Sequence, residues 1–195
     1  LGLVLLGLAA AMTVVRWTPP RPLARISDGV LFFSSTLLFL ALGLPFVHRV
    51  QASGDEVEYL LMAQSLWREG DLDVRDNWAR GDYLDYVPGM EKPMFGTVTA
   101  KGIPISTHSP GLPALLAPIY ALGGRKGAVA AMALLASWLA IATRRLAFRL
   151  TNDEPAALAA WAAVVASPLA FYTFYLYTEV PSALVLVLAL LVLLG

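Results

Sequence analysis

Residues 29–47 read GVLFFSSTLLFLALGLPFV, an apolar run without Asp, Glu, Lys or Arg. A helix needs about 20 mainly apolar residues to cross roughly 30 Å of hydrocarbon, and this run has that length. The whole chain agrees, since 58% of it is hydrophobic, 14% is charged and its mean hydropathy is +0.67. We therefore expect an all-α integral membrane protein rather than a water-soluble domain.

Other stretches have the composition of membrane-spanning helices, namely residues 1–15, 125–143, 155–172 and 179–195. The chain begins and ends inside apolar runs, so we expect residues 1–195 to be the N-terminal part of one transmembrane domain. Residues 111–122 are apolar but too few to cross alone, which favours a short juxtamembrane or re-entrant helix. The predicted fold is a multi-pass transmembrane helical bundle.

Two arginine clusters predict the orientation, because Lys and Arg in short loops are retained on the cytoplasmic side. One cluster precedes the run 29–47 and the other follows 125–143: Arg16, Arg21 and Arg25, then Arg144, Arg145 and Arg149. The clusters share a side only if 111–122 does not cross. Residues 48–109 then form a large extracytoplasmic loop with ten acidic and six basic residues, a net charge of 6 − 10 = −4. We expect a multi-pass protein of the plasma (inner) membrane.

Near the start of this loop, residues 57–68 have the pattern of an amphipathic juxtamembrane helix. One face of the helical wheel carries Tyr59, Leu60, Ala63, Leu66 and Trp67, and the opposite face carries Glu58, Ser65, Arg68 and Glu69. A helix lying in the interface would hold the residues at its N-terminus at a fixed depth.

Asp55 and Glu56 stand at that N-terminus and are candidate catalytic residues. A carboxylate close to the lipid surface can accept a proton from an attacking hydroxyl. The alternative is structural: Ser53 and Glu56 match a capping box, and Asp55 would interact favourably with the helix dipole. Tyr59, one helical turn after Asp55, is a candidate substrate-binding residue.

A second carboxylate, Glu179 in Tyr177-Thr178-Glu179-Val180-Pro181, falls at the predicted outer start of the last apolar run. Ionisable groups at the edge of a span are functional candidates. The alternative is a helix start, with Thr178 as the cap and Glu179 complementing the dipole. Asp55 and Glu179 are also candidate ligands of a divalent metal ion, the one cofactor that the sequence suggests.

His108 and Lys92 belong to the same loop and are candidate contacts for a substrate phosphate. The alternative for each is an ordinary solvated side chain. The chain has no cysteine, which excludes disulfides, thiolate metal sites and a thiol nucleophile. We see no basic face for nucleic acid.

Three groups of residues carry a resemblance to a known family. They are Gly54-Asp55-Glu56 with the following 59–66 and Gly70-Asp71-Leu72-Asp73, then His108-Ser109-Pro110-Gly111-Leu112-Pro113, then Tyr177-Thr178-Glu179-Val180-Pro181. Their order and predicted sidedness over residues 29–195 resemble the N-terminal half of bacterial GT-C membrane glycosyltransferases. That superfamily includes the protein mannosyltransferases and the aminoarabinose transferases.

The resemblance implies transfer of a sugar from a polyprenyl-phosphate carrier to a glycan, lipid or protein acceptor on the extracytoplasmic face. It implies that Asp55, with Glu56 beside it, matches an acidic residue essential in the first outer loop of the family, and that Glu179 matches a second acidic residue at a later span. Several relatives carry Asp at this second position, so the role of Glu179 is open. Metal use varies across the superfamily.

A non-enzymatic membrane protein is the rival hypothesis, either a transporter or a structural subunit. In a transporter, acidic side chains would line a solute path in the middle of the spans. Residues 29–47, 127–142 and 155–168 contain no Asp, Glu, Lys or Arg. This absence favours the enzyme hypothesis.

Overall fold

A computed structural model describes residues 26–89, 95–98, 104–166 and 168–194 of the chain. The apolar run 29–47 lies in helix α2 (Asp28–Arg49), as predicted. The side chain of Ser27 accepts a hydrogen bond from the backbone nitrogen of Val30 and caps the helix, with Asp28 in the first turn and Arg49 in the last. Acids at the N-terminus and bases at the C-terminus both interact favourably with the helix dipole.

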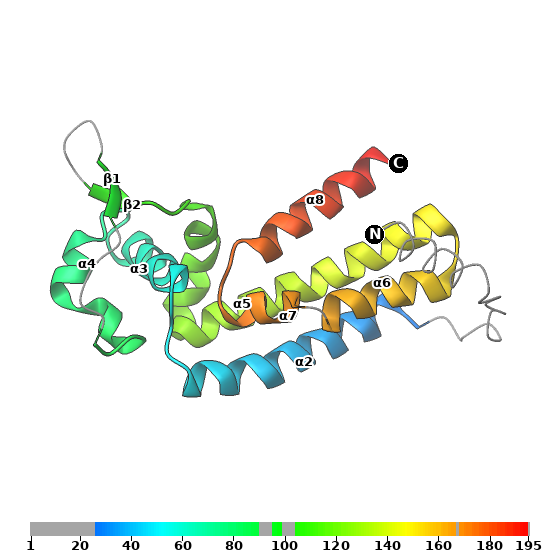
Figure 1. Ribbon diagram of the computed structural model, residues 1–195, viewed down its shortest axis with the longest axis horizontal. Helices are drawn as coiled ribbons and strands as arrows, with labels where there is room; N and C mark the ends of the chain where they lie inside the picture. Colours follow the sequence, from blue (N-terminus) through cyan, green and yellow to red (C-terminus); the bar gives the residue numbers. More distant parts are fainter. Residues whose placement is uncertain (1–25, 90–94, 99–103, 167, 195) are drawn as a thin grey trace, which may run out of the picture.

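Helix α5 (Gly111–Thr151) is interrupted at Gly124, where φ is 54° and ψ is −143°. Residues 111–123 therefore form a short helix of their own, and 125–151 form a long one, as the sequence predicts for 111–122 and 125–143. The turn between them is tight: a Cβ placed on Gly127 would lie 2.6 Å from the carbonyl oxygen of Ile119. Figure 1 shows the short green part of α5 running across the end of the long part.

The predicted continuous helix 155–172 is wrong. The structure has α6 (Glu154–Ala166) and α7 (Leu169–Phe174) in its place. Pro168, the residue before α7, lacks the N–H donor that a helix continuing from α6 would need at that position. Helix α8 (Glu179–Leu193) begins at Glu179, where the sequence predicts a helix start, although Thr178 makes no side-chain capping bond.

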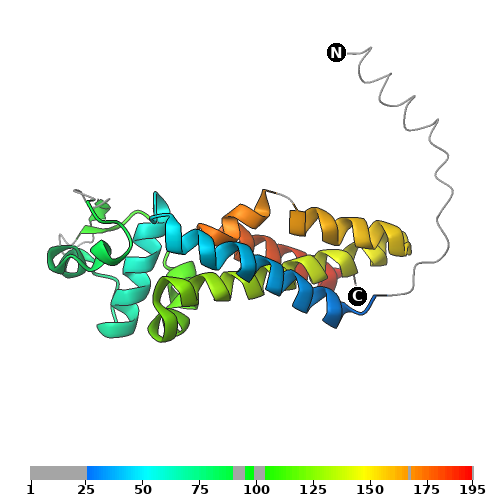
Figure 2. The same ribbon diagram turned by 90° about the horizontal axis from the view of Figure 1, so that it is seen from below.

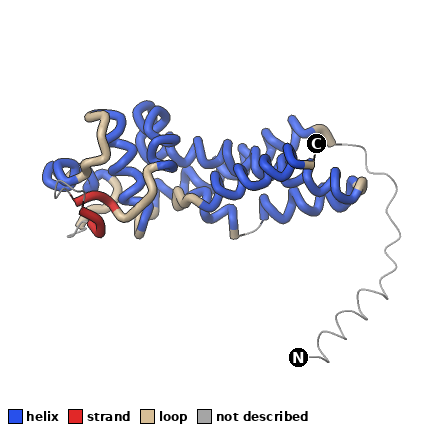
Figure 3. Tube along the Cα trace, turned by 90° about the horizontal axis from the view of Figure 1, so that it is seen from above, coloured by secondary structure: helices blue, strands red, loops and turns tan. Residues whose placement is uncertain are grey.

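The loop 48–109 is folded. It contains α3 (Asp55–Arg68), α4 (Arg75–Arg80), the 3₁₀ helix η1 (Asp82–Asp85) and strands β1 (Phe95–Val98) and β2 (Pro104–Ser106). The two strands pair antiparallel as a small hairpin, which the sequence did not predict. Figure 3 shows this hairpin in red at one end of an otherwise helical molecule. The described chain is thus all-α apart from the hairpin.

Helix α3 differs from the predicted amphipathic helix, because it is buried on every side between Glu56 and Ser65. Glu58 and Ser65, predicted on the polar face, have no exposed surface, whereas Trp67, predicted on the apolar face, is 58% exposed. Leu112 and Leu116 of the short part of α5 belong to the same core as α3. Protein therefore covers the helix where we expected water and lipid.

The long part of α5 forms the centre of the bundle and packs against α2, α6 and α8. Figures 1 and 2 show α2 and α6 lying alongside it. Contact with α2 is close at Gly43, where an added Cβ would lie 2.8 Å from Phe174 of α7 and 2.9 Å from Val129 of α5. This packing aligns the helices along one axis.

Among the described residues, α2 and α5 are long and apolar enough to cross a membrane, while α6 and α8 are shorter apolar helices. The outward face of α2 carries exposed apolar side chains such as Phe33 and Leu37, as a lipid-facing helix would. The predicted span 1–15 and the arginine cluster of residues 16–25 lie outside the described residues.

Candidate functional site

Helix α3 begins at Gly54, whose backbone has φ 59° and ψ −136°. This conformation is essentially restricted to glycine. Gly54, not Ser53, is the N-cap residue and provides no side-chain cap, although the Glu56 carboxylate accepts a hydrogen bond from the Ser53 backbone as a capping box would have it. The space beside Gly54 is bounded by Tyr177, whose hydroxyl would lie 3.5 Å from an added Cβ. The glycine thus starts the helix against the segment that leads into α8.

Asp55, the first residue of α3, contacts His108. The Nε2 atom of His108 lies 3.1 Å from Oδ1 of Asp55, and the side chains are 15% and 50% exposed respectively. Among the described residues no other side chain forms an ion pair or hydrogen bond with this carboxylate. The half-exposed carboxylate can therefore be reached from solvent.

The orientation of the His108 ring follows from its neighbours. The Ser106 hydroxyl lies 3.2 Å from Nδ1 and accepts a hydrogen bond from the His108 backbone N–H, also at 3.2 Å. If the hydroxyl donates to Nδ1, the Nε2 hydrogen is directed at Asp55, which is the tautomer that satisfies all three contacts. The ring of Tyr59 packs edge-on against the imidazole, with the ring centroids 5.3 Å apart.

Two tyrosines connect Asp55 with Glu179. Burial raises the pKa of Tyr59, the charges of Asp55 and Glu179 raise it further, and a hydrogen bond from Thr178 opposes them. Burial likewise raises the pKa of Tyr177, and both carboxylates add to that shift. The Tyr177 hydroxyl lies beside Gly54, and Thr178 hydrogen-bonds Tyr59, so the segment that leads into α8 and carries Glu179 lies against the start of α3, which carries Asp55. Figure 1 shows the starts of α3 and α8 toward the same end of the bundle.

Glu56 is directed elsewhere, into a buried ion pair with Arg125. The Nε and NH2 atoms of Arg125 lie 2.9 and 3.1 Å from the two carboxylate oxygens, a bidentate arrangement. Burial raises the pKa of Glu56, while the hydrogen bonds and the charge of Arg125 oppose the shift. Arg125 also donates to the carbonyls of Val47 and Val50 at the end of α2. The contacts of Arg125 explain the acid at position 56 by its structural role, without a catalytic one.

A groove of about 520 Å³ adjoins the cluster between the short part of α5 and the start of α8. Its walls are mainly apolar, with Leu112, Leu115 and Val185 among them, and the hydroxyls of Ser109 and Thr178 line it as well. Ser109 follows His108 and Thr178 precedes Glu179. The groove therefore runs from the acidic cluster along an apolar path.

The chemistry available at the cluster is proton transfer and phosphate or hydroxyl recognition. In the described part of the chain no three His, Cys, Asp or Glu side chains are grouped as metal ligands require. Asp55 and Glu179 thus do not form a complete metal site by themselves, and their role as metal ligands stays a prediction. Lys92 lies outside the described residues.

Three members of this region were missed at the sequence level: Arg125, Ser106 and Tyr177. Arg125 offered a signal, because an arginine on the predicted outer side departs from the positive-inside pattern and so needs a partner. Ser106 offered none, since its contact with His108 depends on the hairpin. Tyr177 stands in the motif around Glu179, but its approach to Gly54 depends on the tertiary fold.

No protein-family model matches this chain, and no curated protein or solved structure does either. The geometry of the cluster is therefore the main physical basis for a functional proposal.

Proposed function

We propose that this chain is part of a GT-C type membrane glycosyltransferase that moves a sugar from a polyprenyl-phosphate donor to an acceptor on the extracytoplasmic face. The observation that carries the proposal is the cluster of Asp55, His108 and Glu179 around Tyr59 and Tyr177. In this proposal two acids from separate parts of the chain act together at one end of apolar helices. Sugar transfer at a membrane surface needs acidic side chains positioned in this way, close to the lipid.

Asp55 is the base in this proposal. The acceptor oxygen forms a bond to the anomeric carbon of the sugar as the bond from that carbon to the carrier phosphate oxygen breaks. The electron pair of the broken bond leaves with the polyprenyl phosphate, and the acceptor proton passes to the free oxygen of Asp55. General-base catalysis of this kind contributes about 10² to 10⁴ in rate. His108 holds the other oxygen and so orients the carboxylate.

The groove next to the cluster suits the lipid part of the donor. Apolar walls favour a hydrocarbon chain because its burial removes apolar surface from water. Ser109 and Ser182 line the groove and offer hydroxyls that can hydrogen-bond the phosphate. Glu179 is then close to the sugar end of the donor, where it can hydrogen-bond a sugar hydroxyl.

In this proposal the helices form a multi-pass bundle in the plasma membrane, with α3 and the hairpin on the outer side. Its support is the two helices of spanning length and the exposed apolar face of α2. The acidic cluster then lies near the outer surface of the bilayer, within reach of a lipid-linked donor. The acceptor is a glycan, a lipid or a protein.

The test uses the full-length protein that contains this chain, in membranes supplied with polyprenyl-phosphate sugar donors. We expect Asp55→Asn and Glu179→Gln to lower sugar transfer by about 10²-fold or more, because each removes a charge from the cluster. Asp73→Asn is the matched control, since Asp73 is an acid of the same loop that pairs with Arg75 away from the cluster. Wild-type transfer in both cluster variants would refute the proposal.

A further inference from the structure

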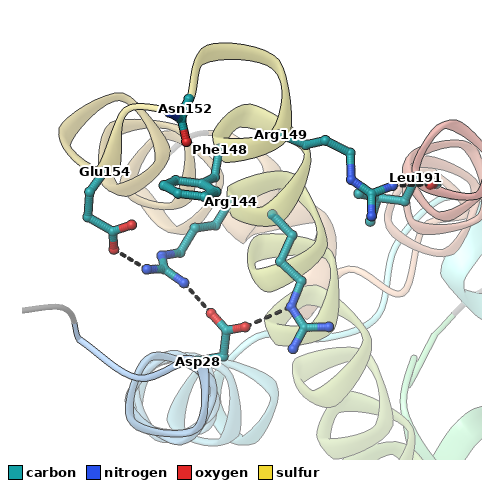
Figure 4. Close-up of a pocket in the computed structure, with 8 residues that line it drawn as sticks. Asp28, Arg144, Phe148, Arg149, Asn152, Glu154 and Leu191 are labelled. Atoms are coloured by element: carbon teal, nitrogen blue, oxygen red, sulfur yellow. Dashed lines mark hydrogen bonds and ion pairs between the residues drawn. The ribbon is translucent and has the colours of Figure 1, made fainter. Parts of the chain in front are cut away.

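The opposite end of the bundle holds a second cavity, of about 550 Å³, between the start of α2, the end of α5, the start of α6 and the end of α8. Figure 4 shows the charged residues around it. Asp28, Arg144, Arg145, Arg149 and Glu154 supply three positive and two negative charges, a net of 3 − 2 = +1. The cavity is thus lined by charged side chains from three helices, α2, α5 and α6, and by the apolar Leu191 of α8.

The two carboxylates mainly neutralise Arg144. Its guanidinium, almost fully buried, bridges Asp28 and Glu154, as the dashed lines in Figure 4 show. Arg145 contributes only its Nε to Asp28, at 2.7 Å, and its side chain is 63% exposed. The acids therefore hold the inner arginine in place and leave the outer ones largely available.

Arg149 meets no carboxylate within the described residues. Its NH1 donates instead to the carbonyl of Leu191 near the end of α8, at 2.6 Å. The guanidinium has five N–H donors, so several remain for a ligand. Arg145 and Arg149 are one helical turn apart on α5 and both line the cavity. Two such groups suit the oxygens of a phosphate.

Apolar side chains adjoin these arginines. Phe148 and Leu191 line the cavity, and the neighbouring Val192 and Leu193 are each 80% exposed. A ligand that fits both surfaces has a phosphate group attached to hydrocarbon. Basic pockets between membrane helices bind lipid head groups through this combination.

We propose that this cavity binds the phosphate of an anionic phospholipid, with Arg145 and Arg149 as the contacts and the acyl chains along α8. The site lies at the other end of the helices from the Asp55 cluster and does not depend on glycosyl transfer. It does depend on the chain lying in a bilayer, where this end faces the leaflet opposite to α3.

Native mass spectrometry of the full-length protein in detergent, titrated with phosphatidylglycerol or phosphatidylcholine, tests the proposal. Arg145→Gln with Arg149→Gln should weaken phosphatidylglycerol binding about thirtyfold, and Arg149→Gln alone about fivefold. The single variant keeps the test valid if the double variant does not fold, because Arg149 makes no ion pair among the described residues. The matched control is Arg49→Gln with Arg75→Gln, which removes two charges at the other end and should bind as the wild type does.

The proposal would be overturned if the control variant lost as much phosphatidylglycerol binding as the cavity variants, or if the cavity variants lost none. Equal binding of the two lipids by the wild type would do so as well. Inorganic phosphate separates the two sources of a phosphate group: competition by phosphate at the lipid's own concentration would assign the cavity to a free anion and reject the lipid. We expect phosphate to compete only at far higher concentration.

Discussion

At Asp55, one oxygen is held while the side chain remains half exposed. His108 contacts Oδ1, and Ser106 and Tyr59 contact the imidazole. A carboxylate tied at one oxygen keeps a narrow range of orientations, which reduces the entropy lost when a reactant approaches the other oxygen. Asp55 can therefore act as a well-oriented base although its side chain is half exposed.

The ion pair of Glu56 and Arg125 is expected to stabilise the fold around Asp55. Removing one partner leaves a buried charge without its counterion, and we predict that Glu56→Leu or Arg125→Leu lowers the free energy of unfolding by about 3 kcal/mol. The double variant should cost less than the sum of the two, because no charge is then left unpaired. Chemical unfolding in mild detergent measures the free energy of unfolding of the two single variants and of the double variant.

The matched control for this cycle is the exposed pair of Asp73 and Arg75, of the same charge type. Its single variants should change stability far less, since solvent screens exposed charges. If the losses of Glu56→Leu and Arg125→Leu simply add, the two side chains do not act as a pair, and the structural explanation of Glu56 is wrong.

Part of the site could be predicted from sequence because its polar residues adjoin apolar runs. Asp55, His108 and Glu179 each stand where a helix begins or shortly before one, and helix starts can be read from local patterns. The partner of Glu56 could not be predicted in this way. Arg125 reaches it only because the chain breaks at Gly124 and turns back, a tertiary consequence of one backbone angle.

At the scale of elements, the break in α5 positions the site. The short part of α5 carries Leu112 and Leu116, which pack on α3, and the long part carries Arg125, which binds Glu56. The turn at Gly124 thus brings the leucines of the short part and Arg125 of the long part against the same helix, α3. A straight α5 would carry its first residues away from the bundle and leave α3 without its cover.

We predict that Gly127→Leu destabilises the protein by about 1–3 kcal/mol, since its side chain would collide with the Ile119 carbonyl and force the turn open. Gly123→Ala is the matched control, because an added methyl there meets nothing within 4 Å and alanine favours helix by about 1 kcal/mol. Thermal unfolding in detergent should show a lower midpoint for the first and an equal or higher one for the second. If the unfolding midpoint falls equally in both variants, the collision with the Ile119 carbonyl does not explain the loss of stability.

The composition of the sequence predicted where the helices lie better than it predicted where they end or which segments cover them. The apolar runs predicted α2, α8 and both parts of α5, because a long apolar helix is specified locally. The break before α7 was missed although Pro168 signals it. The burial of α3 could not be read from its wheel, because Glu58 and Ser65 look like surface residues until other segments cover them.

At the scale of the molecule, charge separates to the two ends of the helices. The Asp55 cluster and the Glu56–Arg125 pair lie at one end, and the arginines that follow the long part of α5 lie at the other with Asp28 and Glu154. The middle of α2 carries no charge between them. This is the distribution expected of helices that cross a bilayer, with each charged end in contact with water.

The cysteine-free sequence allows a direct test of sidedness. In the full-length protein, with any cysteine outside these 195 residues replaced by serine, we predict that an impermeant maleimide added to intact cells labels Asp85→Cys and does not label Thr151→Cys. Both positions are exposed, and they lie in η1 and at the end of α5, near opposite ends of the bundle. Labelling of both after the membrane is permeabilised is the control that each cysteine is reactive. Labelling of Thr151→Cys alone in intact cells would put the acidic cluster in the cytoplasm, away from an extracytoplasmic acceptor, and would overturn the proposed topology and the sugar transfer together.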